Sequence, residues 1–201
     1  DVKASETIGP LRGAGEVALD GSDVRLTLDV DTDDDESAPE GGSVGSNANF
    51  FGVMSGTGGL TKTGDGNQLL SGTGTFDART DVLEGTLSLD DGMAIEDSRD
   101  VNVAAGATLN VLSSEAIGKL GNIEDAGGTI DVDNGAVLTT GGNDATGNAT
   151  IGASTFSGNI TGLGGLTHQG TGEFILQNLA GDGVPDSDFS GPTRVENGTL
   201  T

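Results

Sequence analysis

The residues best suited to chemistry form an acidic run near the start of the chain. Four aspartates alternate along the sequence, and a glutamate stands at the twelfth position from the first of them: Asp29, Asp31, Asp33, Asp35 and Glu40. An EF-hand loop surrounds Ca²⁺ with oxygen ligands at a similar spacing. However, Asp34 stands where that loop needs glycine, Pro39 interrupts it, and no helix pattern flanks it. The run therefore predicts a flexible calcium-binding loop or, alternatively, a solvated run of charges.

A weaker acidic group lies nearer the C-terminal end and consists of Asp182, Asp186 and Asp188. These aspartates are a second candidate for calcium, although the repeated Gly-Gly-x-Gly-x-Asp motif of calcium-binding β-helices is absent. The chain has no cysteine, which excludes thiolate ligands and disulfides. Calcium is therefore the one cofactor that the sequence suggests.

Catalytic residues are scarce. His168 is the sole histidine and no Gly-x-Ser-x-Gly motif accompanies it, so we predict an exposed polar turn residue and no nucleophilic triad. Polysaccharide hydrolases and lyases need clustered acids, with basic residues to hold an acidic sugar. Acids are plentiful, but the eight lysines and arginines are scattered, and there is no Trp or Tyr to stack on a sugar. We therefore predict no enzymatic activity and keep a polysaccharide-active enzyme as an alternative.

The 32 acidic and eight basic residues give a net charge of −24. This charge disfavours nucleic acids and anionic membrane surfaces as partners, and favours divalent cations and basic proteins. No apolar run approaches the ~18 residues of a membrane-spanning helix, so we do not expect this segment to insert into a membrane. The N-terminus lacks a signal-peptide pattern and the C-terminus stops within a repeat, so we expect a longer parent chain.

One stretch of the chain occurs twice and predicts how the rest is organised. Residues 50–89 return as residues 156–201, and F-x-G-x-[MI]-[ST]-G-x-G-G-L-T begins at both Phe50 and Phe156. The second copy has seven extra residues within 177–188, as expected of a loop insertion on a repeated β unit. The six phenylalanines occupy repeat positions, which predicts that they stack in the core.

Apolar residues alternate along several segments, including 24–30 and 101–111, which predicts short β-strands. The glycines at 85, 106 and 128 recur at intervals of 21 and 22 residues, the length of a coil with three short strands. We predict one all-β domain over 1–201, a right-handed parallel β-helix (β-solenoid) of about nine coils. Three related segments with a V-x-x-G-x-x-L pattern, at 82–87, 101–109 and 130–138, should stack on one another. We also predict loop excursions, among them an acidic loop at 31–42, and one short helical turn at 113–121.

The run from Gly58 to Leu89 resembles the autotransporter-associated β-strand repeat, G-x-L-x-K-x-G-x-G-x-L-x-L-S-G-x-x-x-[YF]-x-G-x-T-x-[VI]-x-x-G-x-L. The matching residues of the first copy are Gly59, Leu60, Lys62, Gly64, Gly66, Leu70, Ser71, Gly72, Phe76, Thr80, Val82, Gly85 and Leu87. Those of the second copy are Gly165, Leu166, Gly170, Gly172, Phe174, Leu176, Phe189, Gly191, Thr193, Val195, Gly198 and Leu200. Ala78 replaces a glycine of the pattern, and His168 replaces its lysine.

The resemblance implies the passenger domain of a bacterial autotransporter, a parallel β-helix repeat protein that is secreted through the outer membrane and displayed at the cell surface. It implies a structural or adhesive segment, and we expect the acidic loops to contact a host, neighbouring-cell or self protein surface. Two alternatives remain open. One is a calcium-assisted subunit of a surface layer or filament, because the ends of a β-helix are unpaired sheet edges. The other is the polysaccharide-active enzyme.

Overall fold

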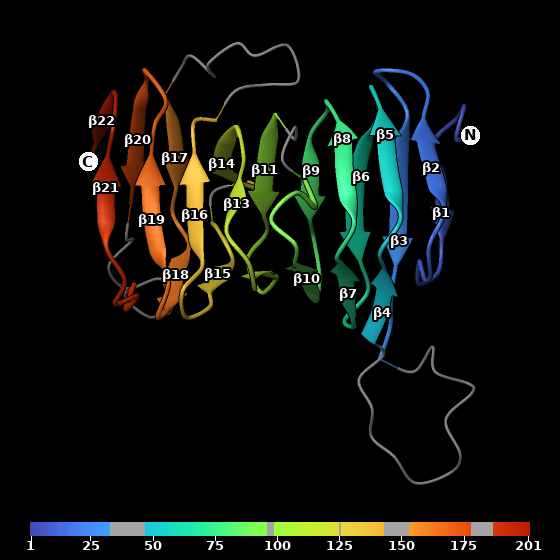
Figure 1. The fold of residues 1–201 in the computed structure, drawn as a ribbon, viewed down its shortest axis with the longest axis horizontal. Coiled ribbons are helices and arrows are strands. Elements are labelled where there is room, and N and C mark those ends of the chain that lie inside the picture. The colour runs from blue at the N-terminus through green and yellow to red at the C-terminus, as the bar shows by residue number, and fades with distance from the viewer. Residues whose placement is uncertain (33–46, 96–98, 125, 143–152, 178–186) are drawn as a thin grey trace, which may run out of the picture.

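The computed structural model describes residues 1–32, 47–95, 99–124, 126–142, 153–177 and 187–201. The regular structure in these ranges is entirely β-strand, with no helix and therefore no helical membrane span. The strands stack along one axis, and the two chain termini lie at opposite ends of the molecule (Figure 1). The predicted all-β class is confirmed.

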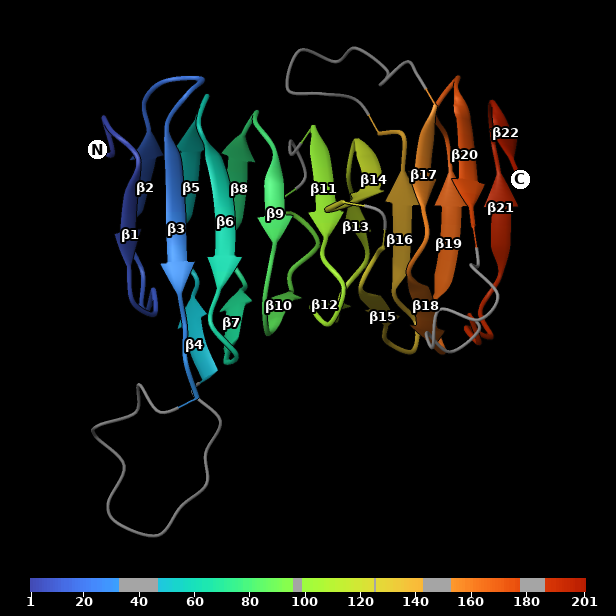
Figure 2. The same ribbon diagram turned by 180° about the vertical axis from the view of Figure 1, so that it is seen from behind.

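Two six-stranded sheets run along the molecule, and their neighbouring strands pair in parallel. The first, in front in Figure 2, has the order β1 (Glu6–Ile8), β3 (Arg25–Asp29), β6 (Gly59–Thr63), β9 (Thr80–Val82), β11 (Asp100–Val103) and β14 (Lys119–Asn122). The second has the order β4 (Asn47–Phe50), β7 (Asn67–Leu70), β10 (Thr86–Leu89), β12 (Thr108–Val111), β15 (Thr129–Val132) and β18 (Asn159–Gly162).

Three shorter parallel sheets complete the fold. One contains β2 (Glu16–Leu19), β5 (Val53–Gly56) and β8 (Thr73–Phe76). Another contains β13 (Glu115–Ala116), β16 (Val137–Thr140), β19 (Gly165–His168) and β21 (Thr193–Val195). The last contains β17 (Ser154–Phe156), β20 (Glu173–Leu176) and β22 (Thr199–Leu200).

Consecutive strands belong to different sheets, and the chain returns to a sheet after two or three strands. β4, β5 and β6 lie in three sheets, and β7 then pairs with β4. On the second six-stranded sheet, Thr86 lies beside Thr108 and Thr108 beside Thr129, as the recurrence of 21 or 22 residues predicts. These parallel strands are consistent with a β-helix.

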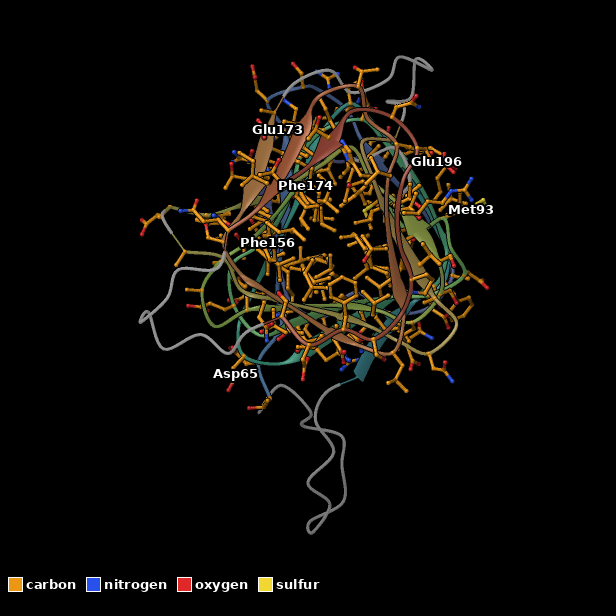
Figure 3. All side chains as sticks on the ribbon, turned by 90° about the vertical axis from the view of Figure 1, so that its left-hand side faces the viewer. Asp65, Met93, Phe156, Glu173, Phe174 and Glu196 are labelled. Atoms are coloured by element: carbon orange, nitrogen blue, oxygen red, sulfur yellow. The ribbon has the colours of Figure 1, made fainter. Side chains whose placement is uncertain are left out.

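Along most strands alternate residues point inwards, and these residues form one core. Leu87, Leu109, Ile130 and Ile160 are successive cross-strand neighbours, and all four are fully buried. Looking along the stacking axis, inward side chains gather in the centre, whereas acidic residues such as Glu173 lie on the outside (Figure 3). The apolar rows of the sequence are therefore the interior of the stack.

The prediction that all six phenylalanines stack in the core is wrong for one of them. Four are buried and Phe189 packs against the core, but Phe51 is 56% exposed. Phe51 directly follows the buried Phe50, and adjacent residues of an extended chain point to opposite sides.

For three strands, the boundaries in the two copies of the repeat agree to within one residue. β5, β6 and β7 of the first copy correspond by position to β18, β19 and β20 of the second. Gly85 and Gly198 both have positive φ, and an added Cβ would lie 2.4 Å from the carbonyl oxygen of Gly64 or Gly170, respectively. The two copies therefore build the same turn, although their strands occupy different sheets.

The predicted helical turn at 113–121 is wrong, because this segment forms β13 and β14. Glu115 and Ile117 are both buried, and this alternation is that of an extended strand. The Glu115 carboxylate accepts hydrogen bonds from the backbone N–H groups of Ala94 at 3.1 Å and Ile95 at 3.4 Å. Glu115 therefore points inwards and binds the backbone of the neighbouring coil, instead of lying at the start of a helix.

The stacking of the V-x-x-G-x-x-L segments is confirmed for two of the three. Val82 lies beside Val103, as predicted, but Val132 lies beside Val111. The first two segments run from the first six-stranded sheet (β9, β11) to the second (β10, β12). The third runs from the second six-stranded sheet (β15) to the sheet of β16, so it is displaced by one sheet relative to the first two.

Candidate functional site

Lys62 is a fully buried cation on the inner side of β6. It follows Leu60 by two residues and therefore points inwards with it. Its Nζ donates hydrogen bonds to the backbone carbonyl oxygens of Gly64 at 2.7 Å and Glu84 at 3.4 Å, and to that of Thr63. It also lies 3.5 Å from the carbonyl oxygen of Val30. Turns of neighbouring coils thus converge on one ammonium group.

Four carboxylates surround this ammonium: Asp29, Asp31, Glu84 and Asp65. Burial lowers the pKa of Lys62, and the negative charges of the four carboxylates oppose that shift. Thr32 donates its backbone N–H at 2.8 Å and its hydroxyl at 3.1 Å to Asp65, and these bonds lower the pKa of the Asp65 carboxyl. This corner of the fold is an oxygen-rich cation site that the protein fills with its own lysine.

The structure places only part of the first predicted calcium loop. Asp29 Oδ1 accepts a hydrogen bond from the Thr63 hydroxyl at 2.9 Å, and Asp31 lies half-buried next to Gly64. The remaining candidates, Asp33, Asp35 and Glu40, lie outside the described residues. Asp29 and Asp31 therefore sit beside a buried ammonium, and calcium binding by the loop stays a prediction.

The second calcium candidate is also described in part. Asp188 is exposed, and its backbone N–H donates to the carbonyl oxygen of Ile160 at 3.0 Å. Asp182 and Asp186 lie outside the described residues. Over the ranges that the structure covers, no group of three or more acidic or histidine side chains is arranged to hold a metal ion.

The prediction of an exposed His168 is wrong. His168 ends β19, is 4% exposed, and occupies the repeat position of Lys62. Its Nδ1 lies 3.1 Å from the Thr140 hydroxyl and its Nε2 lies 3.2 Å from the carbonyl oxygen of Gly172, while its ring packs on Phe174. His168 follows the buried Leu166 by two positions and therefore points inwards, where its ring nitrogens lie beside the Thr140 hydroxyl and the Gly172 carbonyl oxygen.

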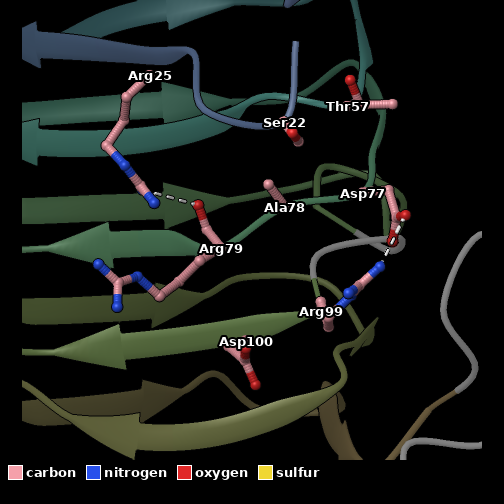
Figure 4. A pocket seen from close by; sticks show the side chains of 8 residues that line it. All are labelled: Ser22, Arg25, Thr57, Asp77, Ala78, Arg79, Arg99 and Asp100. Carbon is pink, nitrogen blue, oxygen red and sulfur yellow. Dashed lines mark hydrogen bonds and ion pairs between the residues drawn. The ribbon is translucent and has the colours of Figure 1, made fainter.

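A groove of about 560 Å³ lies where the chain enters strands of the first six-stranded sheet. Its lining comes from four successive coils and consists of Ser22, Arg25, Thr57, Asp77, Ala78, Arg79, Arg99 and Asp100. Figure 4 shows these residues arranged along the stacking direction, with Arg25 and Arg79 on one side and Asp77 and Arg99 on the other. Three of the eight basic residues of the chain therefore meet in one groove.

Buried and half-buried aspartates hold these arginines in place. Asp81, which is 4% exposed, binds Arg25 at 3.3 Å and the Nε of Arg79 at 2.9 Å. Arg99 binds Asp77 at 3.0 Å. The side chains of Arg79 and Arg99 are about half exposed, so each can offer further N–H groups to a ligand.

The arrangement can bind a ligand through charge-assisted hydrogen bonds. A guanidinium edge matches the geometry of a carboxylate, and neighbouring Asp, Ser and Thr oxygens accept or donate hydrogen bonds to hydroxyl groups. The basic residues are scattered along the sequence, so the sequence alone did not predict this groove. The R-T-D segment that begins at Arg79 was visible in the first repeat, but its alignment with Arg25 and Arg99 depends on strand register.

The chain is similar to an autotransporter adhesin. Over 147 residues it is 36% identical to the adhesin BmaC autotransporter of Brucella suis biovar 1 (strain 1330). The aligned region is 73% of this chain and 4% of the Brucella protein, so the chain spans a small part of that protein's length. No protein-family model and no solved structure matches the chain. The similarity is consistent with the predicted autotransporter passenger, whereas membership of the β-strand repeat family stays a prediction.

Proposed function

We propose that this chain is a rigid adhesive segment of a bacterial autotransporter passenger, exported through the outer membrane and displayed at the cell surface. The observation that carries the proposal is the similarity to an autotransporter adhesin over most of the chain. The parallel strands, which stack along one axis, support a right-handed β-helix of about nine coils. Such a rod would hold its partner-binding surfaces away from the cell.

An adhesive role explains the chain better than a catalytic one. The carboxylates of Asp77 and Asp81 in and beside the groove are engaged by arginines. A general acid or base must instead exchange a proton with its substrate. The groove therefore supports binding more than bond cleavage, and a polysaccharide-active enzyme is the less favoured candidate.

Adhesion is tested with beads that carry the purified chain, allowed to settle on host or bacterial cell layers and then washed under flow. Beads coated with a protein of equal size and net charge, but unrelated sequence, are the matched control. We expect more chain-coated beads than control beads to stay attached. Equal retention of both kinds of beads would contradict the proposed adhesive role.

Calcium-assisted assembly is the second proposal, because the acidic run at 29–40 has a spacing typical of calcium ligands. The mass of the purified chain is measured by light scattering in EDTA and in millimolar calcium. A larger mass in calcium, abolished by Asp33→Asn with Asp35→Asn, would support assembly. A monomer under both conditions would exclude calcium-driven self-association and leave adhesion to a foreign surface.

A further inference from the structure

The arginine groove differs in charge from the rest of this strongly acidic chain. The chain has a net charge of −24, yet the groove lining contains three arginines and two aspartates. Asp81 beside it balances the remaining positive charge. A ligand with many negative charges would be repelled by the whole molecule at long range, whereas a ligand with isolated carboxylates meets the arginines at short range. The charge distribution therefore selects for sparsely charged anions.

An ion pair with Asp81 fixes the side chain of Arg79 in a position where it can bind such an anion. Asp81 receives hydrogen bonds from Arg25, from Arg79 and from the side-chain amide of Asn102. The Arg79 guanidinium is bound through Nε, and its two terminal nitrogens have no hydrogen-bond partner within the described part of the chain. A guanidinium already fixed on one side loses less conformational entropy when it binds a ligand on the other side.

The remaining lining suits hydroxyl groups. Ser22 and Thr57 are exposed hydroxyl residues on one part of the groove, and Asp100 supplies carboxylate oxygens on another. The apolar side chain in the lining is Ala78, so the groove offers no pocket for the large apolar or aromatic anchors that dominate peptide interfaces. Its polar composition favours a sugar over a peptide.

We propose that this groove binds a carboxylated sugar chain that lies along the stacking axis. A sugar carboxylate accepts hydrogen bonds from the terminal nitrogens of Arg79, and sugar hydroxyls bind Asp100, Ser22 and Thr57. The proposal deepens the adhesive function and rests on it, because it names the class of surface molecule that the chain would hold. Four coils contribute to the lining, so the site requires the stacked strands and not one repeat alone.

Binding is measured by calorimetry with a tetrasaccharide that carries a single uronic acid carboxylate among neutral sugars, against the same tetramer with that carboxylate methyl-esterified. We expect the ester to bind about tenfold more weakly or not at all, because it cannot form charge-assisted hydrogen bonds with arginine. Arg79→Gln should weaken binding of the acid tetramer by a similar factor. Arg79→Lys should also weaken it, because lysine keeps the charge but lacks the planar fork.

Arg194→Gln is the matched control, since Arg194 is also ion-paired through Nε, to Glu196 at 3.2 Å, but lies outside the groove. It should leave binding unchanged, and melting curves should show all three variants folded. Equal affinity for acid and ester, equal losses in the Arg79 and Arg194 variants, no binding at millimolar sugar, or tighter binding of polyglutamate would each overturn the proposal. Bead adhesion that persists with Arg79→Gln would contradict the groove inference while leaving the adhesive function standing.

Discussion

Lys62→Met tests whether the buried ammonium holds the turns of neighbouring coils together. Methionine keeps most of the side-chain length and volume, so the main loss is the hydrogen bonding of Nζ. The carbonyl oxygen of Gly64, 2.7 Å from Nζ, has no other hydrogen-bond donor among the described residues. By contrast, the carbonyl oxygen of Val30 still accepts a bond from the backbone N–H of Gly66 at 2.7 Å.

These contacts determine how much unfolding free energy Lys62→Met should lose. Leaving one buried carbonyl without a donor costs about 1–3 kcal/mol. The surrounding carboxylates also lose their cation, whereas the variant no longer has to bury an ammonium, and these two effects have opposite signs. We expect Lys62→Met to lower the free energy of unfolding by about 2 kcal/mol, which for a chain of this size lowers the melting temperature by about 4–8 °C.

Thermal unfolding followed by circular dichroism measures this change. Lys119→Met is the matched control, because Lys119 is a half-buried lysine on β14 and its loss changes the net charge by the same amount. We expect the control to melt close to the wild type. A Lys62→Met variant as stable as the wild type, or a control that loses as much stability, would refute the role given to the ammonium.

Three further predictions concern stability. The pKa of Lys62 is lower in the folded chain than in the unfolded chain, where it is about 10.4. Between these two pKa values the unfolded chain binds more protons, so the stability of the wild type relative to Lys62→Met should rise with pH up to about 10.4. Urea titrations of both proteins over this pH range measure the change. Gly85→Ala should cost more than Gly106→Ala, because both glycines have positive φ but only at Gly85 would a Cβ meet backbone oxygens, at 2.4 Å; denaturation midpoints measure the difference, expected to exceed about 1 kcal/mol. Glu115→Ala should lower the unfolding free energy by about 2–3 kcal/mol, since two backbone N–H groups lose their acceptor, whereas Glu16→Ala on the surface should change it little.

Period-two alternation and the internal repeat predicted the all-β class and many of the strands. The predicted strand at 24–30 appears as Arg25–Asp29. Alternation is reliable here because each strand buries one side against the core, and that requirement acts on residues close together in sequence. The same rule fits β13 and β14, where the capping residues of 113–121 predict a helical turn instead.

The buried polar residues could not be predicted from residue type. Lysine is usually exposed and histidine is intermediate, so residue type alone does not indicate that Lys62 and His168 point inwards. Their hydrogen-bond acceptors are backbone carbonyls, which carry no sequence signal. Val30, for example, approaches Lys62 only because β3 pairs with β6.

The arginine groove required the register of the stacked coils. Asn67 lies beside Thr86, whereas Thr129 lies beside Asn159, so one coil is shorter than 21 residues and another is much longer. A fixed recurrence therefore does not tell which arginines become neighbours. Strand pairing supplies that information.

The stacked architecture separates stability from binding. The core depends on inward residues such as Leu109, whereas the groove is built at corners between strands, where residues such as Ala78 can replace the glycine of the repeat. A corner groove runs along the stacking axis, so additional coils with suitable corner residues would lengthen the groove and add sites for successive units of a polymer. Affinity for a repeating sugar chain would then grow through multivalency, without any strong single contact. A β-helix with more coils that carry arginines at these corners should accordingly bind long carboxylated sugar chains much more tightly than tetramers.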